Sequence, residues 1–508
     1  HGTLDTRHYD SVVLGGFFTI PQALSAATVT IKDGALLLGD GLIGGLVVQS
    51  GAIVAPGHST GTLTIAGDYQ PVSGSIYEAQ VSGDGTSDLI DASGAATIAA
   101  GAELKASKYG AMPLTVGTVH TVLTAHSVTG TYTVLDDGAL TAFLKADASY
   151  DSKHAYLTVA QSRDPVAAAT TPNQRAAAAG LQSTPSGNAV RVAVLNLPDD
   201  AAAAAAFDSL SGEIHASLRG ALLLDTRAPR EAALDRLRIA LSHGAEIWSR
   251  TYGALGHVAN DGNGAAIDNR TGGFLFGADL PLGKSGRIGV FGGAGNDGIA
   301  GRGTAQSSDF TLGAYGGNRF GPLAIRLGGT VTAHQIATDR TLDLAGSTTN
   351  LTASYGGTTA QIFGEAGYVI DAGALTFEPY AGFSYAALHT NAFSESGDGG
   401  VTAAAQTSSL GTMTLGLRAT AEFGALHIGG SLGWQHLLSP TVATSTQHFA
   451  GGADFTVAGA PLPRDSALAD LDLDLKLSDV ANLTLSYAGS FAPTGSSQSA
   501  TAQFRLRF

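Results

Sequence analysis

The stretch ADLDLDLKLS, residues 469–478, decides the fold of the second half of this chain. Leucine occupies every second position and Asp or Lys the positions between, so an extended strand of this sequence has one apolar and one charged face. The same period of two recurs in LAIRLGG (323–329) and TAQFRLRF (501–508). About twelve such segments follow residue 246, each near the length of a tilted membrane-spanning strand.

An antiparallel sheet with one apolar face is either a water-soluble sandwich or a transmembrane barrel. The number of strands, their length and the aromatic residues at their ends favour the barrel, because lipid admits only a closed sheet without unpaired edges. We therefore predict an all-β protein with one helical segment, in which residues 246–508 form an antiparallel transmembrane barrel of about twelve strands.

The composition supports this class and excludes others. Charged residues make up 14% of the 508 residues, against about 25% in a typical soluble domain. The net charge of −15 disfavours nucleic acid as a partner. The lack of Cys excludes disulfides, thiolate zinc sites and Cys nucleophiles. No apolar run approaches the roughly 18 residues of a membrane-spanning helix, so only strands could cross a membrane.

Upstream of the barrel the sequence changes character three times. Residues 1–165 contain short β-type runs separated by Gly, Asp and Ser turns, which predicts a right-handed β-helix stub ending in a small β cap. Residues 166–198 are rich in Ala, Thr and Pro and predict a linker. Residues 199–245 predict a helix over 199–224 and a second helical piece over 229–241. The chain opens in mid-pattern, and we expect the natural protein to extend further upstream.

Charged residues on the polar faces of the barrel strands are the main functional candidates. In a membrane barrel these faces point into the lumen, where water or opposite charges solvate them. The functional interpretation is a lining that holds the helix and keeps the pore wet during translocation; the alternative is that every barrel interior is polar, and alternation alone does not separate the two. The candidates are Arg250, Glu365, Glu378, Arg418, Asp470, Asp472, Asp474, Arg505 and Arg507.

The helix over 199–224 is expected to lie inside the barrel. At 1.5 Å per residue it is about 39 Å long, enough to cross the roughly 30 Å hydrocarbon core. Glu213, His215 and Arg219 make it too polar to face lipid, so the charge-lined lumen is the place at that depth where it can sit. We expect Arg219 to pair with the acidic ladder Asp470, Asp472 and Asp474.

Several segments resemble the autotransporters, the type V secreted proteins of Gram-negative bacteria. EIWSRTYGALG (246–256) resembles the family's first barrel strand, and LSGEIHASLRGALL (210–223) resembles its pore helix. Further resemblances are GEAGY (364–368), FEPYAGFSY (377–385) and FSESG (393–397) to central strands, FTVAGAPLPRD (455–465) to the segment before the tenth strand, and GDYQPVSGSIYEAQVSG (67–83) and TVLTAHSVTGTY (121–132) to the coils and autochaperone end of a β-helical passenger.

The resemblance implies a place in the cell and a set of partners. The barrel would sit in the outer membrane among lipid and lipopolysaccharide, with the helix threading it and the passenger displayed outside. Phe504, Leu506 and Phe508 resemble the signal read by the β-barrel assembly machinery, and periplasmic chaperones would assist. We expect a monomer without cofactor or enzymatic activity. Residues 199–243 contain no Asn, so the cleavage between adjacent asparagines in some protease members cannot be carried over.

The leading functional hypothesis is transport and display of the chain's own passenger. One alternative is a surface adhesin whose β-helix binds host molecules. Another is the anchor of an enzyme that precedes His1. Repeats continuing upstream would favour the adhesin, and a globular, non-repetitive domain would favour the enzyme.

Three local patterns resemble catalytic or metal sites. GHSTG (57–61) matches the serine-hydrolase elbow around Ser59, but a strand rather than a helix is expected after it, so we interpret it as a coil turn. Five histidines lack the close spacing of a metal site and are interpreted as surface or lumen residues: His58, His120, His126, His154 and His215. DGNG (261–264) and SGDGG (396–400) lack the distal Glu of a calcium loop and are interpreted as hairpin turns.

Overall fold

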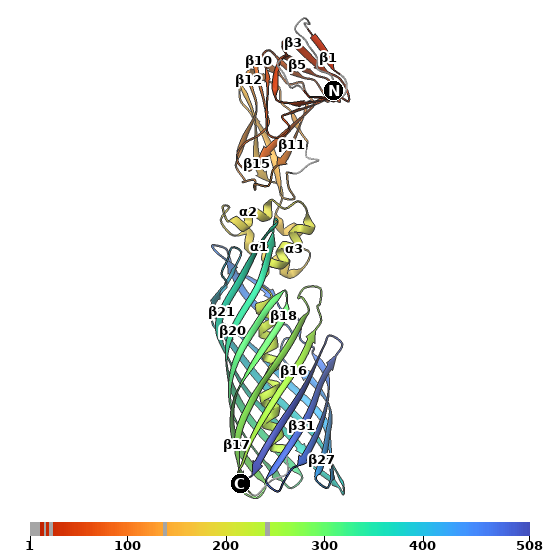
Figure 1. Cartoon of the computed structure of the whole chain (residues 1–508), viewed down its shortest axis with the longest axis vertical. Helices are drawn as coiled ribbons and strands as arrows, with labels where there is room; N and C mark the ends of the chain where they lie inside the picture. The colour runs from red at the N-terminus through yellow and green to blue at the C-terminus, as the bar shows by residue number, and fades with distance from the viewer. Residues whose placement is uncertain (1–10, 15–16, 20–23, 136–139, 239–243, 508) are drawn as a thin grey trace. The chain divides into compact units, whose positions relative to one another are not determined.

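The computed structural model describes residues 11–507 except 15–16, 20–23, 136–139 and 239–243. The chain divides into two compact units, drawn in Figure 1. The β-helix unit contains the chain up to Ala169, the segment Thr184–Ala206 and the three residues Leu344–Gly346. The barrel unit contains Thr170–Ser183, Phe207–Asp343 and Ser347 onward.

The β-helix unit is built from short strands that alternate between two parallel sheets. The strands are β1 (Ser11–Leu14), β2 (Phe17–Thr19), β3 (Leu24–Ile31), β4 (Leu36–Gly39), β5 (Gly41–Val48), β6 (Ile53–Pro56), β7 (Thr62–Ile65), β8 (Tyr69–Pro71), β9 (Ile76–Ser82), β10 (Leu89–Thr97), β11 (Glu103–Tyr109), β12 (Val119–Thr129) and β13 (Thr133–Val134). One sheet runs β1-β3-β5-β7-β10-β12 and the other β2-β4-β6-β9-β11-β13. Val29, Leu46 and Ile90 fill the interior between them.

Glycine turns stack on one another where the coils change direction. Gly34, Gly51, Gly74 and Gly101 all have φ between 72° and 86°, a conformation that side chains disfavour. The N–H of Gly34 donates to the carbonyl of Gly51, and the same bond joins Gly51 to Gly74 and Gly74 to Gly101. The turn signals in the sequence therefore mark one continuous ladder.

The parallel stack ends in an antiparallel cap. Strand β15 (His154–Gln161) pairs antiparallel with β12 and with β14 (Leu144–Tyr150). A short 3-10 helix, η1 (Pro165–Ala168), follows. The cap covers the edge strand β12, as expected for the small β cap at the end of the stub.

The segment 166–198, predicted as a linker, is mostly helical. It contains α1 (Pro172–Gln182) and α2 (Ala189–Leu195). Thr171 caps α1 by accepting the N–H of Gln174, whose side chain in turn accepts the N–H of Thr171. Pro172 stands in the first turn, where the missing N–H has no helical partner to lose. Proline here begins a helix rather than breaking one.

The barrel unit contains a closed barrel of twelve antiparallel strands, which confirms the predicted fold. The strands are β16 (Glu246–Val258), β17 (Ile267–Leu282), β18 (Gly286–Gly301), β19 (Gly303–Phe320), β20 (Leu323–Leu344), β21 (Ser347–Tyr368) with its continuation β22 (Ile370–Ala372), β23 (Leu375–Thr390), β26 (Gln406–Phe423), β27 (Leu426–Leu437), β30 (Asp465–Lys476), β31 (Ala481–Ala492) and β32 (Gly495–Arg507). Pairing of β16 with β32, from Glu246 with Arg507 to Val258 with Gly495, closes the ring.

The two ends of the barrel differ in loop length. At one end two to four residues join the strands of each hairpin, as between Leu282 and Gly286 or between Phe423 and Leu426. At the other end, residues 391–405 and 438–464 form long loops that contain a separate sheet of β24 (Phe393–Ser394), β25 (Val401–Ala403), β28 (Thr444–Phe449) and β29 (Phe455–Ala458). Outer-membrane barrels place short turns in the periplasm and long loops outside. We call the two ends the turn end and the loop end.

The predicted helix over 199–224 is interrupted. Helix α3 (Asp200–Leu210) ends before Gly212, which has a φ of 63°. Helices α4 (Ile214–Asp225) and α5 (Arg227–Arg238) follow. The residues 239–241 of the predicted second piece lie outside the described residues. Among the described residues, none of the helices is both long and apolar enough to cross a membrane.

Candidate functional site: the barrel lumen and its helices

Helices α4 and α5 lie inside the barrel and run from the loop end to the turn end. At its start, α4 is next to Ala265 and Arg302, which follow β16 and β18 at the loop end. Near the end of α5, Arg236 contacts Glu246 and Asp279 at the turn end. The chain therefore passes through the lumen before β16 begins, as the sequence predicted for the helix.

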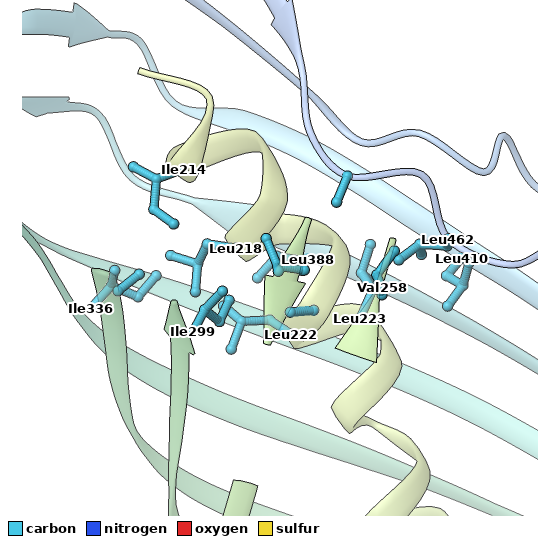
Figure 2. Close-up of a cluster of buried hydrophobic side chains, with 14 of the residues drawn as sticks. Ile214, Leu218, Leu222, Leu223, Val258, Ile299, Ile336, Leu388, Leu410 and Leu462 are labelled. Atoms are coloured by element: carbon cyan, nitrogen blue, oxygen red, sulfur yellow. The ribbon is translucent and has the colours of Figure 1, made fainter. Parts of the chain in front are cut away.

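We call the part of the lumen around α4, nearer the loop end, the upper half; its side chains are mostly apolar. Figure 2 shows Ile214, Leu218, Leu222 and Leu223 of α4 among side chains of the surrounding strands and of the loop after β29. We call this set the collar; its strand and loop members include Val258, Ile267, Ile299, Ile336, Leu388, Leu410, Leu437 and Leu462. The sequence predicted a charge-lined lumen, and this half differs from that prediction.

Two buried carboxylates fix the first turn of α4 at the loop end. Glu213 accepts hydrogen bonds from the N–H of Ala265 (3.0 Å) and from the side chain of Asn173 in α1 (2.9 Å), and it pairs with Arg302. Glu395 pairs with Arg340. Both carboxylates are almost fully buried, so loss of one partner would leave a charge without compensation.

The second carboxylate, Glu395, also contacts the histidine of the helix. His215 Nε2 lies 2.9 Å from Glu395 Oε1, and Nδ1 lies 3.1 Å from the hydroxyl of Tyr355. The ring stacks on Phe393 at 4.1 Å between centroids, and Phe393 stacks on Tyr355 at 4.6 Å. His215 is thus a lumen residue, as predicted, and it is fixed on both ring nitrogens and one face.

We call the part of the lumen around α5, nearer the turn end, the lower half; it contains a network of charged side chains. Arg236 is fully buried and donates to both oxygens of Asp279, at 2.8 and 3.1 Å, and to Glu246. Arg287 pairs with the same two carboxylates. The hydroxyl of Tyr315 donates to Asp279 at 2.8 Å. Two guanidinium groups and two carboxylates thus share one cluster at the end of α5, which we call the Arg236 cluster.

A second cluster surrounds Arg238. Its guanidinium pairs with Glu231 and Asp235 on the same helix and with Glu365 of β21. Glu365 also accepts from Arg326 (2.8 Å) and Arg418 (3.2 Å). Such multiple pairing compensates the burial of each charge.

A cavity of about 890 Å³ lies beside α5 and reaches the end of α4, where the collar residues Leu223, Val258, Leu410 and Leu437 also line it. Its walls include hydroxyl, amide and charged side chains of β16, β30, β31 and β32. The helix therefore fills only part of the barrel's width here, and the space beside it has both polar and apolar walls. The collar is a packed cluster of apolar side chains that borders this cavity on one side.

Aromatic rings inside the lower half lie over glycines of the next strand. A Cβ added at Gly277 would overlap the ring of Trp248, and one at Gly313 would overlap Phe291. These rings pack with Ala232, Ala233 and Leu234 of α5. The small residues give the helix room.

The structure places the nine predicted lumen residues as follows. Arg250, Glu378, Arg418, Asp470, Asp472, Asp474, Arg505 and Arg507 line the large cavity. Glu365 lies in the cluster around Arg238. Arg505 pairs with Asp474, and Arg250 pairs with Asp235 of α5. All nine therefore face the lumen side of the barrel.

One predicted pairing is wrong. Arg219 does not reach the acidic ladder; it donates to the hydroxyls of Ser408 (3.0 Å) and Thr390 (3.3 Å) at the level of the collar. Arg227, on α5, pairs with Asp470 instead. The error has a simple cause: Arg219 lies in the upper half, whereas the ladder lines the cavity of the lower half.

Of the three residues that resemble an assembly signal, two are described. Phe504 is exposed on the outer face of β32, and Leu506 is half-buried. Phe508 lies outside the described residues. The alternation of β32 puts Gln503 and Arg505 on the inner face.

The segments GHSTG, DGNG and SGDGG, which resemble catalytic or calcium motifs, are turns in the structure. Ser59 lies in a bend between β6 and β7, so a strand follows it, and Asp88 accepts the N–H of Gly61 at 3.0 Å. The GHSTG segment is a coil turn, as interpreted. DGNG lies between β16 and β17, where Asp261 accepts the N–H groups of Asn263 and Gly264, and SGDGG connects β24 to β25.

The other four histidines are dispersed over the β-helix unit. His58 and His126 are exposed, and His154 bonds to Asp151. His120 is 1% exposed, which contradicts its interpretation as a surface or lumen residue. It lies on β12, where the alternation of the strand turns it inward, and burial lowers its pKa.

Sequence reasoning missed the collar, Asn173 and the Arg236 cluster. The collar residues of the strands point to the same side as the polar residues. In β20, for example, Ile336 lies an even number of positions from Arg326 and Arg340 and therefore faces the lumen with them. An apolar residue at a strand position that should face the lumen is therefore a sequence signal for the collar. No pattern in the sequence singles out Asn173, because its role depends on a loop about 280 residues away, at Ala458.

Comparisons with known proteins found a matching family model, two relatives and a similar solved structure. Residues 247–488 match the family model of the autotransporter beta-domain. Two relatives from Serratia marcescens, both named extracellular serine protease, are 27% identical over 99% of this chain and 31% identical over 59% of it. These matches cover 54% and 30% of the relatives, so the chain spans about half the length of the curated relatives it matches. The translocator domain of autotransporter NalP from Neisseria meningitidis is 18% identical with a TM-score of 0.48, over 58% of this chain and 99% of that domain.

Proposed function

The chain carries an autotransporter beta-domain, a barrel of the Gram-negative outer membrane, and from this premise we propose that it translocates its own β-helix unit and displays it on the cell surface. One observation supports the proposal most. The chain N-terminal to α4 leaves the lumen at the loop end, which in outer-membrane barrels faces the exterior. The β-helix unit lies N-terminal to α4 in the sequence.

The absence of Cys makes the display testable on intact cells. We would introduce single cysteines by His58→Cys in the β-helix unit, Asp261→Cys at the loop end and Lys284→Cys at the turn end, all exposed positions. A membrane-impermeant maleimide should label the first two on whole cells and the third only after the outer membrane is permeabilised. Labelling of Lys284→Cys alone on whole cells would reverse the orientation and contradict the proposal.

The nature of the displayed activity is a second proposal. The two relatives named extracellular serine protease favour a proteolytic passenger over an adhesin. Within this chain Ser59 is part of a turn, so the nucleophile would belong to a longer form of the protein. A fluorophosphonate probe should then label the natural full-length protein, and Ser59→Ala should not reduce the labelling. Adhesion of cells without any labelled protein would favour the adhesin.

The β-barrel assembly machinery is a proposed partner of the last strand. Phe504 is exposed on β32, and the final residues carry the apolar alternation that such a signal requires. Deleting Phe508 should lower the amount of folded barrel in the outer membrane, measured by the gel shift between heated and unheated samples. Unchanged barrel levels would show that the last residue is only the end of a strand.

A further inference from the structure

Two neighbouring segments of the chain are exchanged between the two units. Thr170–Ser183, which contains α1, belongs to the barrel unit, although the chain before it forms the β-helix unit. Thr184–Ala206, which contains α2, belongs to the β-helix unit, although the chain after it forms the barrel unit. Between Ala169 and Phe207 the chain thus passes from one unit to the other three times instead of once.

The α1 segment is held in the barrel unit by buried polar contacts. The Asn173 side chain donates to Glu213 (2.9 Å) and to the carbonyl of Ala458 (2.8 Å), and it accepts the N–H of Ala458 (2.9 Å). The Asn173 N–H donates to the side chain of Asn263 at 2.8 Å. Asn173 is 1% exposed, so these bonds act in a site that water does not reach.

Packing contacts reinforce this attachment. Ala177, Ala178 and Leu181 of α1 are buried, and the helix packs on β28 and β29. Gly180 lies so close to the ring of Phe455 that an added Cβ would overlap it. The N–H of Ala453 donates to the hydroxyl of Ser183 at 2.7 Å.

The α2 segment is held in the β-helix unit in the same manner. Asn196 accepts the N–H of Leu114 (2.8 Å) and donates to its carbonyl (2.9 Å). The hydroxyl of Thr141 donates to the carbonyl of Leu195 at 2.6 Å. Val194 and Leu195 are buried, and Arg163 pairs with Asp200.

The connection between the two attachments is open to solvent. Pro185, Ser186 and Gly187 are exposed, and a Cβ added at Gly187 would meet nothing within 4 Å. Exposed tips with small residues are preferred sites of proteolytic nicking. A cut here would break the chain without touching either set of buried contacts.

We propose that residues 170–206 form a reciprocal clasp, which keeps the β-helix unit on the barrel after the polypeptide is cut at residues 185–187. After such a cut, α1 is the end of the β-helix fragment and remains bound to the barrel unit. In turn, α2 is the start of the barrel fragment and remains bound to the β-helix unit. The cut protein is then a two-fragment complex held by two separate interfaces, and release of one fragment requires both to open.

The test uses the full chain with an N-terminal affinity tag and a site-specific protease sequence inserted between Ser186 and Gly187. The protein is cut in detergent and captured by its tag. The clasp predicts that most of the barrel fragment is retained on the tag after cutting. Immediate separation of the two fragments would overturn the proposal. Because the assay uses solubilised protein, its result does not depend on whether the unit is displayed on cells.

Variants separate the clasp from nonspecific retention. Asn173→Ala and Asn196→Ala each remove several buried or half-buried hydrogen bonds and should speed dissociation of the cut protein about tenfold or more. The double variant should release the barrel fragment almost completely. Asn350→Ala, at an exposed position of β21, is the matched control and should behave like the parent. Retention that is equal in all four proteins would also overturn the proposal.

A second cut site and a second kind of variant distinguish loss of the clasp from misfolding of the variants. Cutting between Ala169 and Thr170 leaves only the α2 attachment, so Asn196→Ala alone should then release the fragment. Gly180→Leu should displace α1 from Phe455 without removing a polar group. The gel shift between heated and unheated samples shows whether the barrel is folded in every variant. On cells that pass the cysteine-labelling test, the parent should keep the cut β-helix fragment at the surface.

Discussion

The two halves of the lumen enclose the same helical segment by different means. Around α4, the collar packs apolar side chains from strands and helix. Around α5, arginines and carboxylates pair across the lumen beside a cavity of about 890 Å³. Apolar packing excludes water without directional partners, whereas the charged half keeps its groups paired or solvated. From this difference we expect the collar to be the main barrier to water in the pore, with the cavity ending against it at Leu223, Val258, Leu410 and Leu437, and the charged half to position the helix.

The largest expected effect comes from breaking the seal. Leu218→Asp together with Leu222→Asp would hydrate the collar, and single-channel conductance in a planar bilayer should rise by about tenfold or more, because a hydrophobic constriction blocks ions by dewetting. Leu237→Asp, in the lower half, is the control and should leave conductance nearly unchanged. An equal rise in both proteins would place the seal elsewhere.

The next effect tests the charged half. Arg236→Leu leaves Glu246 and Asp279 with less compensation in a buried cluster, and it should destabilise the barrel by about 3–5 kcal/mol. The measurement is the temperature at which the compact form disappears on an unheated gel. Arg236→Lys keeps the charge but loses the bidentate pairing with Asp279. Its melting midpoint should therefore fall between those of the parent protein and Arg236→Leu.

A smaller effect tests how tightly the collar is packed. Ile336 is fully buried, and Ile336→Val removes one methylene group, which should cost about 0.5–1.5 kcal/mol. Conductance should stay low, because one missing methylene leaves no continuous water path. A cost near zero would mean that the collar is looser than its burial indicates. The matched change Leu327→Val, on the outer face of the same strand, should cost less.

The smallest effect concerns the charge that lies among apolar neighbours. Arg219 is as buried as the lower-half arginines, yet its described hydrogen bonds go to two hydroxyls and to no carboxylate. Arg219→Leu should therefore be close to neutral or slightly stabilising, since a desolvated charge is exchanged for an apolar group. A loss as large as that of Arg236→Leu would show that the two halves do not differ in this respect.

The barrel and its lumen-facing charges could be predicted from sequence because a strand has a period of two and lipid requires one apolar face. Asp472 and Arg505 were placed on the lumen side by parity alone. Helix boundaries were harder, since Gly212 interrupts a helical pattern and Pro172 begins one through the capping box of Thr171 and Gln174.

Pairings across the lumen could not be predicted. Which strand faces Arg219 depends on the rotation and depth of the helix, and neither leaves a trace in the local pattern. The exchange of α1 and α2 between units depends on distant contacts such as that of Asn196 with Leu114. Contacts of this kind are fixed by tertiary packing, and they leave no periodic pattern in the sequence from which they could be predicted.

The pairing of β16 with β32 joins the two ends of the barrel sequence, and it has a consequence for the order of assembly. The contacts of α5 with β16 and β17, such as Arg236 with Glu246 and Arg250 with Asp235, join residues close in sequence. Closure between β16 and β32 joins residues that are far apart, and such loops form late because their entropy cost is larger. We therefore expect the helix to be in place against the first strands before the last strand arrives, so that the barrel closes around it rather than admitting it afterwards.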